Sequence, residues 1–225
     1  MKPTYQLFGL PLLVLIGAFA CTAQTPPSAD STLDAPGVPA FLKALPQPEA
    51  EPWTPITREQ RLEHYQAQIF SPSAAIGAAV GAAIGQSINS PKEWGQGWGA
   101  YGMRAASGYA STLVSNTITF GVSALVHEDN RYFRSKRQDF IARLGHVIAS
   151  PYVSRNDAGR QHLSVSMLLG SAGASSIPLV WSPASWQGLN NVGLNYLIWY
   201  GQAAGVNLVR EFHPTVVRIF RAKKP

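Results

Sequence analysis

The sequence has little cysteine and little charge. Its 225 residues include one cysteine, Cys21, and only 13% of them are charged, which is about half the share in an average soluble domain. A lone cysteine excludes an internal disulfide and a cysteine-based zinc site. The formal net charge of +6 is compatible with anionic partners such as lipid headgroups or cell-wall polymers.

Recognised catalytic motifs are also missing. The chain has no nucleophile elbow, P-loop, dinucleotide fingerprint, zinc-ligand spacing or paired-carboxylate motif. These absences argue against the enzyme classes that depend on such motifs. We therefore expect no metal and no cofactor, and we favour a protein that is not an enzyme.

The N-terminus has the three parts of a bacterial secretory signal. Lys2 supplies the positive charge, residues 7–20 form an apolar run too short for a comfortable membrane span, and Ala18-Phe19-Ala20 supplies the cleavage pattern. We expect residues 1–23 to be a signal peptide and the mature chain to be exported to the periplasm or cell envelope. Export argues against a nucleic-acid partner.

Cys21 follows this pattern directly, and its position leaves two interpretations. In the first, the cysteine is lipidated and anchors the chain, for example in an outer membrane. In the second, ordinary cleavage before Cys21 or after Ala23 leaves a free thiol or removes it. Lipoprotein signals usually carry an aliphatic residue three positions before the cysteine, where this chain has Ala18, so the resemblance to a lipoprotein signal is partial.

A proline-rich segment separates the signal from the rest of the chain. Residues 24–56 hold eight of the 17 prolines, and Ala, Thr and Ser make up much of the remainder. Proline rings fix φ and remove backbone donors, so no helix or central strand is expected here. We expect a flexible tether over 24–56 and a helical domain over 57–225.

Charged residues are sorted into separate parts of that domain. Asp, Glu, Lys and Arg are absent from 64–91, 105–127 and 161–209. One interpretation is a polytopic membrane protein. Two observations oppose it: the blocks are rich in Ser, Asn, Gln and Gly, and the basic residues fall on the wrong side for the positive-inside rule. We therefore favour a mainly α-helical, compact bundle of about five to seven helices, in which Gly/Ala/Ser-rich helices pack closely.

Local signals place the individual helices. Thr57 and Gln60 match a capping box, Ser71-Pro72 resets the chain, and Ser150-Pro151 ends a helix. A proline after His213 predicts the start of a separate final helix. The expected helices are Thr57–Phe70, Ala74–Ile88, Arg104–Val126, Asp139–Ala149, Leu163–Ile177, Leu189–Phe212 and Thr215–Ala222.

The second of these helices contains a glycine series. Gly77, Gly81 and Gly85 are spaced by four, which places them on one helix face where another backbone can approach closely. A membrane-embedded glycine zipper and a buried helix of a compact bundle both fit this pattern. We favour the buried helix.

Aromatic residues alternate with glycines just before the third helix. Trp94, Trp98 and Tyr101 are interleaved with Gly95, Gly97 and Gly99. This pattern fits an interfacial aromatic belt, a sugar-binding platform, or core packing around a close turn. We favour core packing.

The densest polar cluster is His127-Glu128-Asp129-Asn130-Arg131-Tyr132-Phe133-Arg134. His127 with Glu128 or Asp129 are the candidates for acid–base chemistry or metal binding. However, adjacent residues do not converge on one side of a helix, and the spacing HExxH is absent. We favour a structural corner in which the acids pair with nearby arginines.

A second cluster, Ser154-Arg155-Asn156-Asp157-Ala158-Gly159-Arg160, has the composition of a turn. Its two arginines and those of the first cluster are candidates for binding an anionic group, or for ion pairs that brace the loops. The candidate binding residues are Arg131, Arg134, Arg155 and Arg160.

These two clusters together resemble a family of exported bacterial proteins that has no assigned function. The resemblance covers about residues 57–213 and includes a Gly/Ala helix before the aromatic–glycine segment. It supports the domain boundary and implies no activity.

The sequence thus leaves three hypotheses in order of preference. The first is an exported, membrane-associated helical envelope protein with a structural or interaction role, whose partner is a membrane surface or envelope component. The second is a cell-envelope hydrolase that uses His127, Glu128 and Asp129. The third is an integral membrane protein with glycine-zipper helices.

Overall fold

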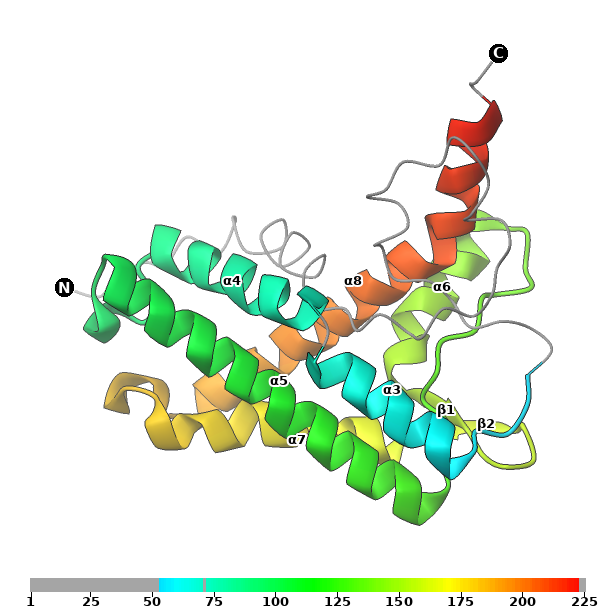
Figure 1. Ribbon diagram of the computed structural model, residues 1–225, viewed down its shortest axis with the longest axis horizontal. Helices are drawn as coiled ribbons and strands as arrows, with labels where there is room; N and C mark the ends of the chain where they lie inside the picture. Colours follow the sequence, from blue (N-terminus) through cyan, green and yellow to red (C-terminus); the bar gives the residue numbers. More distant parts are fainter. Residues whose placement is uncertain (1–52, 71, 223–225) are drawn as a thin grey trace.

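The computed structural model describes residues 53–70 and 72–222. Cys21, the expected signal peptide and most of the expected tether lie outside the described residues. The described chain is mainly helical, as predicted, and its one sheet is a two-stranded antiparallel hairpin (Figure 1). The main elements are α3 (Arg58–Phe70), α4 (Pro72–Ser87), α5 (Trp98–Val126), α6 (Phe140–Ala149), β1 (Val153–Arg155), β2 (Gln161–Leu163), α7 (Val165–Ser176) and α8 (Leu189–Ala222).

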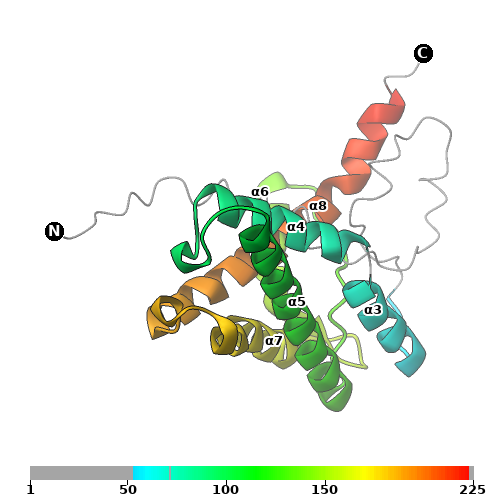
Figure 2. The same ribbon diagram turned by 60° about the vertical axis from the view of Figure 1, so that its left-hand side comes forward.

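Helix α5 is the central element. It contacts α3, α4 and α7 along its length, while α8 packs on α7 and α6. Figure 1 shows α4 beside the N-terminal part of α5 and α3 beside its C-terminal part, with α7 on the opposite side. Figure 2 shows the same order after rotation. The bundle is therefore built around one long helix of 29 residues.

Capping side chains explain several helix starts, and the first of them was predicted from the sequence. The Thr57 backbone N–H donates to Gln60 Oε1 at 3.0 Å, and the Gln60 N–H donates to Thr57 Oγ1 at 3.2 Å, which confirms the capping box. Asp139 accepts from the Ala142 N–H at 2.7 Å at the start of α6. Ser164 caps α7 in the same way through the Met167 N–H. Each cap satisfies a backbone donor that the helix itself leaves unpaired.

Leu163, predicted to begin a helix, lies in β2, and two other predicted boundaries were wrong by more than two residues. Helix α5 begins at Trp98, six residues before the expected Arg104, and α8 runs through Pro214 without the expected break. Proline inside a helix removes one hydrogen bond and crowds the preceding turn. The helix tolerates it because both sides are anchored: Glu211 and Val217 are buried.

Small residues allow α5 and α7 to pack closely. A Cβ added to Gly170 would overlap Thr119 Oγ1 and lie 3.0 Å from the Ser115 carbonyl oxygen, and one added to Gly173 would overlap Ile118 Cδ1. Neighbouring buried serines satisfy their own hydroxyls: Ser175 donates to the Ser171 carbonyl at 2.7 Å. The core thus replaces large apolar side chains by close backbone contact.

The three glycines predicted to share one face of α4 have different surroundings. Gly77 is buried, but Gly81 is exposed, and a Cβ at Gly81 would meet no atom within 4 Å. Gly85 faces the Arg104 side chain and the Ser90 carbonyl oxygen, each 3.1 Å from an added Cβ. In the described chain, the α4 residues that meet α5 closely include alanines of the adjacent row: Ala74 and Ala82 are buried, and Gly108 of α5 lies over Ala78.

The connection between α4 and α5 lies beside the connection between α7 and α8. The short helix η2 (Lys92–Trp94) joins α4 to α5, and η4 (Ile177–Trp181) and η5 (Ala184–Trp186) join α7 to α8. Ser185 Oγ donates to Glu93 Oε1, and Trp181 Nε1 donates to Ser107 Oγ at 3.0 Å. Both tips lie at the left of Figure 1, opposite the hairpin β1–β2.

Candidate functional site

Glu128 is a buried structural anion. It is 1% exposed, and its carboxylate sits at the N-terminus of α7, where it accepts from the Val165 N–H at 2.8 Å, the Ser166 N–H at 2.9 Å and Ser164 Oγ at 3.0 Å. Burial alone would raise the pKa of Glu128, but the hydrogen bonds from Ser166, Val165 and Ser164 outweigh it and lower that pKa. The carboxylate stays ionised and complements the partial positive charge of the helix terminus.

His127 has a different environment from Glu128. It ends α5 in the left-handed conformation, with φ of 56°, and its side chain is 69% exposed. Its Nδ1 lies 3.1 Å from Asp157 Oδ2. The ring therefore points to solvent beside the hairpin turn.

Asp129 is tied to Arg131 and to the second cluster. Its carboxylate accepts from Arg131 Nε at 2.9 Å, from Arg131 Nη2 at 2.7 Å and from Trp53 Nε1 at 3.0 Å. Its backbone exchanges two hydrogen bonds with Arg155, at 2.8 and 3.0 Å. The candidates His127, Glu128 and Asp129 thus occupy three separate environments, and their side chains do not converge.

The four candidate arginines also separate. Arg131 pairs with Asp129, and Arg134 Nε donates to the Glu211 carbonyl oxygen at 3.2 Å. The Arg155 guanidinium lies 4.4 Å from the centre of the Phe133 ring. Arg160 is exposed on the turn between β1 and β2. The clusters meet through backbone pairing, and these four side chains do not form one anion clamp.

A second buried carboxylate, Glu211, was not predicted from the sequence. It is 0% exposed and accepts from Tyr132 Oη at 2.8 Å, the Ser135 N–H at 3.1 Å and Arg143 Nε at 2.7 Å. Burial and this hydrogen bond raise the pKa of the Tyr132 hydroxyl. One signal in the sequence could have pointed to Glu211 as a residue of special role. It is the first acid after the 49 uncharged residues 161–209. It anchors α6 and the segment 132–135 to α8.

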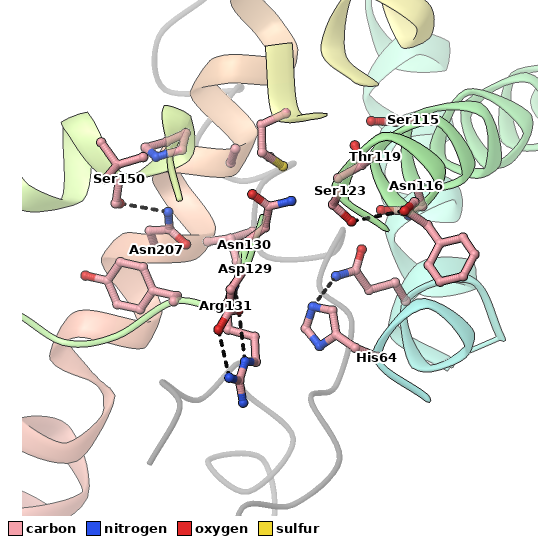
Figure 3. A pocket seen from close by; sticks show the side chains of 18 of the residues that line it. His64, Ser115, Asn116, Thr119, Ser123, Asp129, Asn130, Arg131, Ser150 and Asn207 are labelled. Atoms are coloured by element: carbon pink, nitrogen blue, oxygen red, sulfur yellow. Dashed lines mark hydrogen bonds and ion pairs between the residues drawn. The ribbon is translucent and has the colours of Figure 1, made fainter. Parts of the chain in front are cut away.

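A cavity of about 210 Å³ is not accounted for by these contacts. Figure 3 shows it between the side chains of α3 and α5 on one side and those near α8 on the other, with Asp129, Asn130 and Arg131 between them. The polar residues that line it include His64, Gln68, Ser115, Asn116, Asn130, Arg155, Gln202, Asn207 and Arg210.

Positive charge dominates the cavity wall. Four arginines line it against one acid, Asp129, which already pairs with Arg131. Burial, followed by the positive charge of Arg210, lowers the pKa of His64 to about 4. The neutral ring contacts Gln68 Nε2 at 2.6 Å. Sequence reasoning assigned His64 no role, and no local motif marks it.

The described residues contain no group of three or more His, Cys, Asp or Glu side chains arranged to hold a metal ion. Comparisons with known proteins add no assignment, because no family model, curated protein or solved structure matches the chain. The resemblance to an uncharacterised family of exported proteins therefore stays a prediction.

Proposed function

We propose that this chain is an exported envelope protein that associates with a membrane surface through one half of its helical domain and has a structural or interaction role. The observation that carries the proposal is the partition of charge along the folded chain. We define the low-charge half as residues 72–116 and 165–204, which contain only three charged residues, Lys92, Glu93 and Arg104.

The charge of Arg104 does not reach the surface of this half. Its side chain is 6% exposed, and its guanidinium donates to the carbonyl oxygens of Ser90, Pro91 and Gly95 at 2.8 to 3.0 Å. Only Lys92 and Glu93 remain, and both lie at the tip between α4 and α5. A water-facing surface of this extent normally carries far more charge.

Large apolar side chains are exposed on the low-charge half. Trp98 is 88%, Leu189 87% and Val180 83% exposed. The exposure of Trp98 is contrary to the core packing favoured for it from the sequence, and it fits an aromatic residue at a membrane–water interface. Large apolar side chains are exposed elsewhere too, among them Leu125 and Phe70. On the low-charge half few charged residues accompany them, and an apolar surface with little charge is typical of a contact with lipid or with another apolar partner.

Peripheral contact is favoured over a full span. One described helical stretch, Arg58–Ser87, which comprises α3 and α4, is long and apolar enough to cross a membrane. However, Lys92 and Glu93 follow this stretch closely, at the turn between α4 and α5. Charged groups are costly to place inside a bilayer.

A catalytic role for the cluster at 127–129 has less support. Glu128 has its oxygens occupied by donors from α7, Asp129 has its oxygens occupied by Arg131 and Trp53, and His127 is at the surface. A general base needs a free lone pair within reach of substrate. The arrangement supports a brace between α5, the hairpin and α7.

The test uses two matched leucines at opposite ends of the bundle. Leu189 and Leu125 are 87% and 81% exposed, but Leu125 lies in the last turn of α5 beside the charged corner. In a Cys21→Ser background, which removes any lipid anchor, we expect Leu189→Asp to reduce the membrane-bound fraction of the exported chain several-fold, and Leu125→Asp to leave it nearly unchanged. Fractionation of cells followed by immunoblotting measures both. Equal membrane binding of the two variants and the wild type would contradict the proposal.

A further inference from the structure

The cavity between α3, α5 and α8 contains polar groups that the fold does not use. Within residues 53–70 and 72–222, the side-chain amides of Asn116 and Gln202 have no hydrogen-bond partner, although both line the cavity. Both residues are half-buried, so each amide can exchange solvent in the cavity for a polar group of a ligand. Asn116 comes from α5 and Gln202 from α8, so two separate helices direct amides into one space.

Arg155 is the charged counterpart of these amides. It lines the same cavity, and its contact in the described chain other than backbone hydrogen bonds is with the face of the Phe133 ring. Stacking on an aromatic ring fixes the plane of a guanidinium and leaves its N–H donors available in that plane. No carboxylate of the described residues pairs with Arg155.

The one acid on the wall cannot neutralise this charge. Both Asp129 oxygens are already occupied, Oδ1 by Arg131 Nε and Oδ2 by Arg131 Nη2 and Trp53 Nε1. Arg61 and Arg210 add two further positive charges to the lining. The cavity therefore has an excess of positive charge in a half-enclosed space, where charge–charge interactions are stronger than in water.

We propose that this cavity binds a small molecule that carries a carboxylate or phosphate group, with Arg155 holding the oxyanion and Asn116 and Gln202 binding uncharged polar groups of the same molecule. A guanidinium fork matches either oxyanion through paired hydrogen bonds. The volume of about 210 Å³ limits the enclosed part to a small molecule or to the headgroup of a larger one. Asn116 and Gln202 fall within the ranges of the low-charge half, but this inference does not require that half to contact a membrane.

Two arginines of the same hairpin provide the variant and its control. Arg155 lines the cavity and Arg160 is exposed on the turn five residues later, so Arg155→Gln and Arg160→Gln remove the same charge from the same element. Binding of inorganic phosphate, of citrate, and of phosphatidylglycerol vesicles against phosphatidylcholine vesicles is measured on the full exported chain by calorimetry and by the shift in Tm.

We expect at least one of the anionic probes to bind saturably to the wild type, with affinity about tenfold weaker in Arg155→Gln and unchanged in Arg160→Gln. Asn116→Ala serves as a second variant, because its amide makes no contact that folding requires; it should also weaken binding. Saturable binding of phosphate or citrate indicates a soluble ligand, and binding of the anionic vesicles alone indicates a lipid headgroup. The inference is overturned if no probe binds saturably, or if Arg155→Gln and Arg160→Gln weaken binding equally.

Discussion

At the scale of single residues, the cluster at 127–131 shows how neighbouring side chains in sequence serve unrelated purposes. His127 ends a helix, Glu128 holds the start of α7, and Asp129 joins the loop to the hairpin. Their adjacency first suggested acid–base chemistry. The structure places each side chain in a different contact. Together they hold the end of α5, the hairpin and the start of α7 in place, and they do not form one catalytic group.

This assignment predicts unequal effects of two substitutions in that corner. Glu128→Gln places an amide N–H₂ against the donors of Val165 and Ser166, so we expect it to lower the free energy of unfolding by about 2–4 kcal/mol. His127→Asn keeps a residue suited to the left-handed conformation and removes only an exposed pair, so its effect should stay within about 0.5 kcal/mol.

Chemical denaturation of the wild type and both variants measures these values. A large loss of stability for His127→Asn together with none for Glu128→Gln would show that the corner is held by the exposed pair instead. Loss of a cellular function by a fully stable His127→Asn chain would favour the hydrolase hypothesis.

His64 provides a prediction about pH. Its pKa is lowered to about 4 in the folded chain by burial and by Arg210, against about 6.5 in the unfolded chain. Between these values the unfolded state binds more protons, so stability falls as the pH drops from about 6.5 to about 4, by roughly 3 kcal/mol in total from this residue.

NMR titration of the histidine rings tests this, with His64→Gln used to assign the signals. We expect the His64 ring to remain neutral down to about pH 5. In the His64→Gln chain, the loss of stability over that pH window should be smaller than in the wild type. Titration of His64 near pH 6.5 would mean that burial and the positive charge of Arg210 do not lower the pKa of this ring.

At the scale of elements, the contact between α5 and α7 depends on glycine at one position. We expect Gly170→Ala to destabilise the fold by about 1–3 kcal/mol, because the new Cβ meets the β-branched Thr119 and the Ser115 backbone, which cannot shift easily. Gly81→Ala is the matched control. It lies in open space, so higher helix propensity should stabilise the chain by up to about 1 kcal/mol.

Thermal unfolding of both variants gives the comparison. If Gly81→Ala destabilised the chain more than Gly170→Ala, the glycine series of α4 would be the closer contact, as a glycine zipper with a second molecule or membrane helix requires. The opposite order supports the packing seen in the described chain.

At the scale of the whole molecule, two attachments to a membrane are open to this chain: a lipid on Cys21 and the low-charge half of the helical domain. We expect the Cys21→Ser chain to remain with membranes at neutral pH and to be released by a carbonate wash, because apolar and electrostatic contacts at a surface are reversible. Membrane fractionation with and without carbonate measures this.

Release of Cys21→Ser into the soluble fraction at neutral pH would mean that the lipid alone holds the protein. Retention after carbonate would favour the integral membrane hypothesis. The outcomes therefore distinguish the lipid anchor, the surface contact and the integral membrane protein. None of them depends on the ligand of the cavity.

The sequence by itself determined the helical class, most helix positions and the capping box at Thr57. Charge-free blocks, proline positions and the Thr57–Gln60 pair are local signals, and local hydrogen bonding and steric exclusion act within a few residues of the chain. The continuation of α8 through Pro214 was not predictable in this way, since the burial of Glu211 and Val217 on either side comes from other elements.

Only the tertiary structure decided which side chains meet. Glu128 reaches the start of α7 across 38 positions, Glu211 binds Tyr132 across 79, and Asn116 and Gln202 enter one cavity from two helices. The exposure of Gly81, the middle glycine of the α4 series, likewise depends on how α5 lies across α4. Residue spacing describes one helix at a time, whereas burial, charge pairing and cavity shape depend on the angle and register at which helices pack.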